Sequence, residues 1–79
     1  MADITVTVKL FAQYREGHFK IEERRYPEGV TVEDIIAETG IPVDRFPIGV
    51  MIVNGRHVNE DHPLQDGDTL ALFPKVGGG

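Results

Sequence analysis

The sequence ends in three glycines, Gly77, Gly78 and Gly79, which carry a terminal carboxylate. Glycine has no side chain, so such a run can thread a narrow channel that a Cβ atom would block. Adenylation by ATP turns one carboxylate oxygen into a good leaving group, after which sulfide or an amine can attack the carbonyl carbon. The chemistry that this end of the chain suits best is therefore activation of the Gly79 carboxylate by another protein.

The alternative interpretation of a terminal glycine run is an unstructured end without a role. Two features favour a functional tail. The glycines follow the last predicted strand at a short distance. The five residues from Lys75 to Gly79, when extended, reach about 17 Å from the end of that strand. We expect a domain of residues 1–74 and a flexible tail of residues 75–79.

The other reactive residue types predict no catalytic centre. His18, His57 and His62 lack the spacing of metal ligands. The sequence contains no cysteine, which excludes thiol nucleophiles and disulfides. The paired acids at positions 60–61 and 66–68 lie in turn-like segments, where such side chains bond to nearby backbone. We expect no catalytic residue, no metal site, no permanently bound cofactor and a protein that is not itself an enzyme.

Length and charge narrow the class of partner. A chain of 79 residues is too short to enclose a deep active site. Its net charge of -5 disfavours nucleic acid and favours a basic surface on another protein. The sequence has neither an apolar run long enough for a bilayer nor a signal-peptide pattern. These properties predict a cytoplasmic domain that binds proteins.

Hydrophobic periodicity predicts the strands. Residues 4–11 alternate strictly, and residues 18–26 resume the pattern with Phe19 and Ile21 directed inward. Residues 50–58 suit a hairpin with a type I′ turn at Asn-Gly, and residues 69–73 form the last strand. Leu64, in the polar segment between them, is expected to fill the core.

A helix is predicted between the two halves, over residues 31–40. Thr31 is a suitable N-cap, and Asp34 completes a capping box. Val32, Ile35 and Ile36 form the apolar stripe, and glycine at position 40 supplies the left-handed stop. The helix therefore has one face to bury against a sheet.

The element order is strand, strand, helix, strand, short strand and strand. It predicts an α+β fold in which a mixed sheet of four to five strands packs on one main helix. If the first and last strands are neighbours, they must run parallel at the centre of the sheet. This arrangement is the β-grasp, or ubiquitin-like, architecture.

The segment Val50–Val53 is apolar on both faces, although a helix can cover only one. If Val50 and Ile52 face the helix, alternate residues emerge on the opposite face as either scattered apolar residues or a partner-binding patch. The candidate partner-binding residues are Phe11, Met51, Val53, Phe73 and Pro74. Phe73 is the best single candidate because aromatic residues are typical interface anchors.

Four segments together resemble the MoaD/ThiS family of ubiquitin-like sulfur carriers. They are "VKLFAQYREG", "VNGRHV", "PLQDGDTLALFP" and the terminal Gly78-Gly79. The "LFA..RE" and "DGD…FP…GG" elements are more similar to the molybdopterin-synthase small-subunit branch than to the thiamine branch. The resemblance extends over both ends of the chain.

The resemblance implies a set of partners. A ubiquitin-activating-like adenylyltransferase would adenylate Gly79, and a sulfurtransferase or cysteine desulfurase system would help convert it to a thiocarboxylate. The tail would then insert into the large subunit of an acceptor synthase and give its sulfur to a pterin precursor. Phe73 and Pro74 match family positions near the docking surface.

Two residues depart from the family pattern. Lys75 stands where a second proline is common, and Gly77 stands where alanine or serine commonly precedes the diglycine. The recipient therefore stays open among molybdenum- or tungsten-pterin, thiamine, transfer-RNA and amino-acid pathways, as does attachment to protein lysines.

Overall fold

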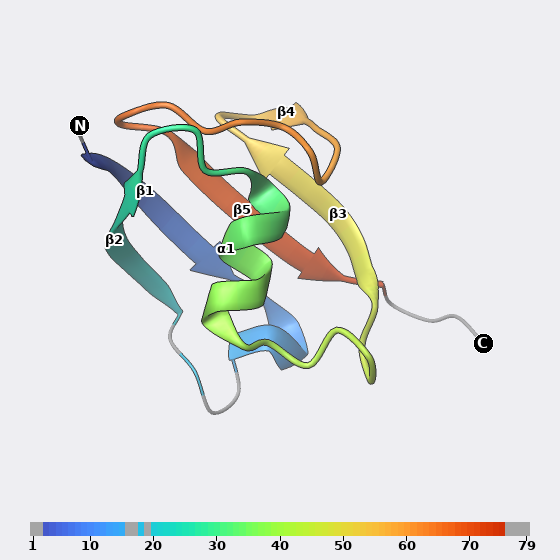
Figure 1. The fold of residues 1–79 in the computed structure, drawn as a ribbon. Coiled ribbons are helices and arrows are strands. Elements are labelled where there is room, and N and C mark those ends of the chain that lie inside the picture. Colours follow the sequence, from blue (N-terminus) through green and yellow to red (C-terminus); the bar gives the residue numbers. More distant parts are fainter. Residues whose placement is uncertain (1–2, 16–17, 19, 76–79) are drawn as a thin grey trace.

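The computed structural model describes residues 3–15, 18 and 20–75, which form a mixed sheet with an α-helix across one face (Figure 1). The strands are β1 (Asp3–Leu10), β2 (Ile21–Pro27), β3 (Ile48–Val53), β4 (Arg56–His57) and β5 (Thr69–Pro74). The helices are the 3₁₀ helix η1 (Ala12–Arg15) and the α-helix α1 (Val32–Thr39). No helix within these ranges is long and apolar enough to cross a membrane.

The five strands lie in the order β2-β1-β5-β3-β4. Strands β1 and β5 are parallel neighbours, with Val8 opposite Leu70, whereas β2 pairs with β1 and β3 pairs with β5 in antiparallel fashion. The last strand is thus inserted between the two halves of the chain, and α1 crosses the sheet in front of it (Figure 1). This confirms the predicted α+β β-grasp.

The start and stop of α1 confirm the predicted capping residues. Thr31 Oγ1 accepts a hydrogen bond from the Asp34 amide at 3.2 Å, and Asp34 Oδ2 accepts one from the Thr31 amide at 3.1 Å. Gly40 ends the helix in the left-handed conformation with φ of 75°. Val32 and Ile35 are fully buried, so this short helix is held mainly by its apolar face.

The core fills the space between α1 and the sheet. Its members from β1 and β5 alternate along each strand and are Ile4, Val6, Val8, Leu10, Leu70 and Leu72. Leu64 is buried as predicted, and its amide donates to the Val30 carbonyl at 2.8 Å. Tyr14 of η1 is also fully buried, although the sequence pattern did not identify it as a core residue. The 3₁₀ helix therefore closes one end of the core.

The second strand differs from the prediction in its orientation. It begins at Ile21, whose side chain is 56% exposed and was wrongly expected to point inward. Ile21 lies opposite Lys9, on the face of β1 that α1 does not cover, whereas Tyr26 is buried. Charged residues occupy most of β2, so alternation alone could not identify its inner face. The other residue expected inward, Phe19, lies outside the described residues.

Candidate functional site

The sheet has an outer face, opposite α1, and its composition depends on how β3 pairs with β5. Val50 lies opposite Phe73, and Ile52 lies opposite Ala71. Leu70 and Leu72, which alternate with Ala71 and Phe73 along β5, are fully buried in the core. Since successive strand residues point to opposite faces, Val50, Ile52, Ala71 and Phe73 share the outer face.

The predicted orientation of β3 was therefore wrong by one residue. Met51 lies opposite Leu72 and Val53 opposite Leu70, so both were incorrectly placed on the outer face. Val53 is only 5% exposed, and Met51 packs against the core. An apolar run of four residues fits either register, and only the pairing with β5 selects the face that meets the helix.

Phe11 extends this outer face beyond the end of β1. Its ring stacks on that of Phe73, with centroids 4.2 Å apart and an angle of 10° between the planes. We call Phe11, Val50, Ile52, Ala71 and Phe73 the outer apolar surface; each is partly exposed. A shallow hollow of about 440 Å³ lies here, lined by Ala12, Val50, Ile52, His57, Phe73 and Pro74. The apolar residues are thus contiguous and not scattered.

Polar groups border the outer apolar surface on both sides. The strand register aligns one residue from each strand across the face, in the order Ile21, Lys9, Ala71, Ile52 and His57. Lys9 of β1 lies on the β2 side of the apolar residues Ala71 and Ile52, and the exposed His57 of β4 ends the row on the other side. An apolar centre with a polar rim is the usual composition of a protein-binding surface.

The C-terminal segment starts next to this surface. Pro74 is buried at the end of β5, directly after Phe73, and Lys75 donates its amide hydrogen to the Pro47 carbonyl at 2.7 Å. The end of β5 thereby lies beside the start of β3 (Figure 1). Gly77, Gly78 and Gly79, predicted to thread a partner and to be modified, lie outside the described residues.

Gly49 lies beside Lys75, and the sequence analysis did not identify it as a functional residue. An ideal Cβ on Gly49 would lie 2.7 Å from Lys75 Cα and 2.9 Å from Lys75 N. The available signal was a glycine inside the otherwise apolar strand "IGVMIV", which is typical of a bulge or of close backbone approach. The glycine allows the backbone of Lys75 to lie directly against β3.

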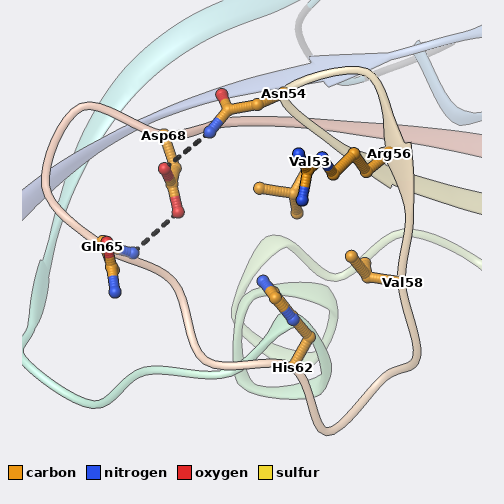
Figure 2. Close-up of a pocket in the computed structure, with 7 residues that line it drawn as sticks. All are labelled: Val53, Asn54, Arg56, Val58, His62, Gln65 and Asp68. Atoms are coloured by element: carbon orange, nitrogen blue, oxygen red, sulfur yellow. Dashed lines mark hydrogen bonds between the residues drawn. The ribbon is translucent and has the colours of Figure 1, made fainter.

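A second hollow lies between the β3–β4 turn and the loop before β5, and hydrogen bonds join three of the residues that line it (Figure 2). The Asp68 carboxylate accepts hydrogen bonds from Asn54 Nδ2 and the Gln65 amide, both at 2.8 Å. Asp66 accepts from the Thr5 amide at 2.8 Å. Asp68 thus bonds to nearby backbone as predicted, whereas Asp66 bonds to the distant first strand. Over the described parts of the chain, no group of three or more metal-binding side chains occurs.

The mixed five-stranded sheet with one α-helix on its inner face defines a β-grasp, or ubiquitin-like, domain, and its apolar outer face adjoins the root of the C-terminal segment. The model of the ThiS family matches residues 8–79, and the chain belongs to this family. A search of curated protein sequences finds no significant match.

Solved structures agree with this assignment. A Pyrococcus furiosus protein described as subunit 1 of a molybdopterin converting factor is 34% identical, with a TM-score of 0.74 over 92% of this chain and 99% of that one. Small archaeal modifier protein 1 of Haloferax volcanii is 24% identical, with a TM-score of 0.74 over 92% and 99% of the two chains. Subunits 1 and 2 of the Helicobacter pylori molybdopterin-converting factor form a complex that includes a chain 24% identical, with a TM-score of 0.59 over 96% and 100%. The last two show the shared fold.

Proposed function

We propose that the protein is a sulfur carrier whose Gly79 carboxylate becomes a thiocarboxylate and donates sulfur in the biosynthesis of molybdopterin, the organic part of molybdenum and tungsten cofactors. The observation that carries this proposal is the continuity between the outer apolar surface and the chain that leads to Gly79. Phe73 belongs to that surface, Pro74 ends β5, and Lys75 begins the C-terminal segment. A partner bound to this face would meet the segment where it leaves the sheet.

The chemistry requires no catalytic group on this chain. A carboxylate oxygen of Gly79 attacks the α-phosphorus of ATP in an activating enzyme, and pyrophosphate leaves. Sulfide then attacks the carbonyl carbon, and AMP leaves. Where a sulfurtransferase or cysteine desulfurase supplies the sulfur as a persulfide, the same attack gives an acyl disulfide, and a second thiol then reduces this disulfide by exchange to release the thiocarboxylate. The protein acts as a cosubstrate, binds no cofactor permanently and works in the cytoplasm, where the activating enzyme has ATP.

Two classes of partner would bind the same face in turn. The activating enzyme receives the carboxylate, and the large subunit of an acceptor synthase receives the thiocarboxylate. Gly77 and Gly78 would pass through the narrow channels that lead to both reaction centres. The similarity to the Pyrococcus furiosus subunit 1 supports the choice of pathway, and the Helicobacter pylori complex of subunits 1 and 2 supports the choice of acceptor.

A second candidate function is covalent protein modification through the same activated terminus. A lysine amine would attack the acyl adenylate, or a thioester formed from it, in place of sulfide. The fold shared with the Haloferax volcanii small archaeal modifier supports this candidate. Sulfur delivery to thiamine or transfer RNA would use the same first step and a different acceptor.

The proposal is tested by intact-mass measurement after incubation with a ubiquitin-activating-like adenylyltransferase, ATP and sulfide. We expect a mass gain equal to the exchange of one oxygen for sulfur, and no gain in a variant that lacks both Gly78 and Gly79. Absence of this gain with all cognate activating enzymes would overturn sulfur carriage. Higher-mass adducts in cell extracts that disappear when Gly79 is deleted would support the modifier instead.

A further inference from the structure

The start of β3 contains a bulge at the point where the C-terminal segment leaves the sheet. Ile48 pairs with Pro74, and Val50 pairs with Phe73, so Gly49 is an extra residue without a partner on β5. Bulges bend a strand and redirect the chain near functional sites. This bulge lies directly beside the backbone of Lys75.

The space beside Gly49 admits no side chain. A Cβ at this position would meet Lys75 Cα at 2.7 Å, Lys75 N at 2.9 Å and the Pro74 carbonyl oxygen at 3.0 Å. All three atoms belong to the backbone, so rotation of a side chain could not relieve the contact. Any residue larger than glycine would therefore displace the chain at Pro74 and Lys75.

A hydrogen bond holds Lys75 at the other end of the bulge. The Lys75 amide donates to the Pro47 carbonyl at 2.7 Å. Lys75 can make this bond because it has an amide hydrogen, which a proline in its place would lack. The backbone of Lys75 is thus bonded to the residue before β3 and closely packed against Gly49 of β3.

Phe46, the residue before Pro47, is held by hydrogen bonds to Tyr14 and Pro42. The Phe46 amide donates to the Pro42 carbonyl at 2.9 Å, and the Phe46 carbonyl accepts a hydrogen bond from the Tyr14 hydroxyl. Tyr14 is fully buried, and burial raises the pKa of its phenol above the ordinary value. The hydroxyl is therefore a donor at neutral pH, and it ties Phe46, the residue before Pro47, to the core.

We propose that Gly49 and the Pro47 carbonyl form a backbone clamp on Lys75, and that this clamp sets the position from which the C-terminal segment enters a partner's reaction centre. The inference rests on the proposed function and assigns Gly49 as a positioning residue for it. Four residues follow Lys75, with an extended reach of about 14 Å. A fixed root therefore limits where the Gly79 carboxylate can be placed.

The clamp should affect reaction more than docking. The outer apolar surface remains available when the root of the segment is displaced, so the carrier should still bind its activating enzyme. Displacement of a reacting group by about 1 Å can lower a rate about 100-fold. We therefore expect the Gly49→Ala variant to show kcat lower by about 10- to 100-fold, with KM for the carrier within about 3-fold of wild type.

The test is ATP–pyrophosphate exchange by the activating enzyme with wild-type, Gly49→Ala and Gly29→Ala carriers, followed by intact-mass measurement after addition of sulfide. Gly29 has φ of 93° and open space around its missing side chain, so alanine there introduces backbone strain without contacting Lys75. Loss of kcat with Gly49→Ala and not with Gly29→Ala, at equal folded fraction, would support the clamp. Equal losses would show that stability alone matters and would overturn it.

A second pair of variants tests the hydrogen bond. Lys75→Pro and Lys75→Ala both remove the side-chain charge, but only the proline variant removes the amide donor. We expect Lys75→Pro to have a kcat about 10-fold or more below that of Lys75→Ala, and the Lys75 amide of wild type to be protected from hydrogen exchange. Equal kcat values with normal sulfur loading would overturn the clamp alone. If the wild-type protein takes up no sulfur at all, both the clamp and the proposed function are overturned.

Discussion

The rings of Phe11 and Phe73 stack with centroids 4.2 Å apart, joining the residue after β1 to the last but one residue of β5. The Phe11 amide also donates to the Leu72 carbonyl at 3.3 Å. The ends of the first and last strands thus meet on the outer face, close to the start of the C-terminal segment. This part of the outer apolar surface is therefore already formed before a partner binds.

The stack should contribute to stability as a pair. Aromatic pairs contribute about 0.5–1.5 kcal/mol beyond the burial of each ring. We expect the free energies of unfolding of Phe11→Ala, Phe73→Ala and the double variant to show a coupling energy of about that size. Urea unfolding of the four proteins measures it. Strict additivity would mean that the rings do not interact.

Phe73 should be required for partner binding and dispensable for folding. Its side chain is partly exposed on the outer face, so Phe73→Asp puts a charge at the centre of the proposed interface without entering the core. We expect affinity for the activating enzyme to fall about 100-fold, as at an interface hot spot, by calorimetry. Ala37→Asp places the same charge on the exposed side of α1 and should leave affinity within about 2-fold. Equal effects of the two variants would contradict this docking face.

Asn54 should stabilise the junction of the β3–β4 turn with β5. Asn54 and Gly55 have positive φ values of 52° and 83°, as a type I′ turn requires. Asn54 Oδ1 also accepts from the Thr69 amide at 3.0 Å. Asn54→Ala should therefore lower the free energy of unfolding by about 1–3 kcal/mol in thermal or urea unfolding.

The control for this variant is Asn59→Ala, which removes an exposed amide side chain from the following loop. We expect its effect to stay within about 0.5 kcal/mol. If the Asn54 and Asn59 variants were equally stable, the hydrogen bonds of the Asn54 side chain, to Asp68 (Figure 2) and to Thr69, would contribute nothing.

Tyr26 should make the fold sensitive to high pH. Burial, reinforced by the hydrogen bond from its hydroxyl to Glu38 at 3.0 Å, raises the pKa of Tyr26 well above its ordinary value of 10.0. The folded state therefore favours the neutral phenol. This contribution is fully present below the unfolded pKa of about 10 and is lost as pH rises above it toward the folded pKa.

The measurement is the free energy of unfolding from pH about 8 to about 11, compared between wild type and Tyr26→Phe. The variant lacks the hydroxyl, so its overall stability is lower, and the slope above pH about 10 is the quantity to compare. We expect a less negative slope for Tyr26→Phe. Identical slopes would show that Tyr26 ionises equally readily in the folded and unfolded states.

Much of the fold was predictable because its signals are local. Strict alternation in β1 identifies its buried face, and Thr31, Asp34 and Gly40 lie where the helix begins and ends. The Asn-Gly pair predicts the hairpin turn for the same reason, since few residues adopt positive φ. Each of these features depends on neighbours within about one turn of chain.

The sequence by itself determined the order of elements and the terminal glycines whose carboxylate could be activated, and it required β1 and β5 to run parallel if they were neighbours; the structure shows that they are. Only the tertiary structure decided that Val50 and Ile52, and not Met51 and Val53, face outward, because strand register depends on residues of β5 far along the chain. It likewise decided the role of Gly49, whose missing Cβ matters only because the backbone of Lys75 lies against it.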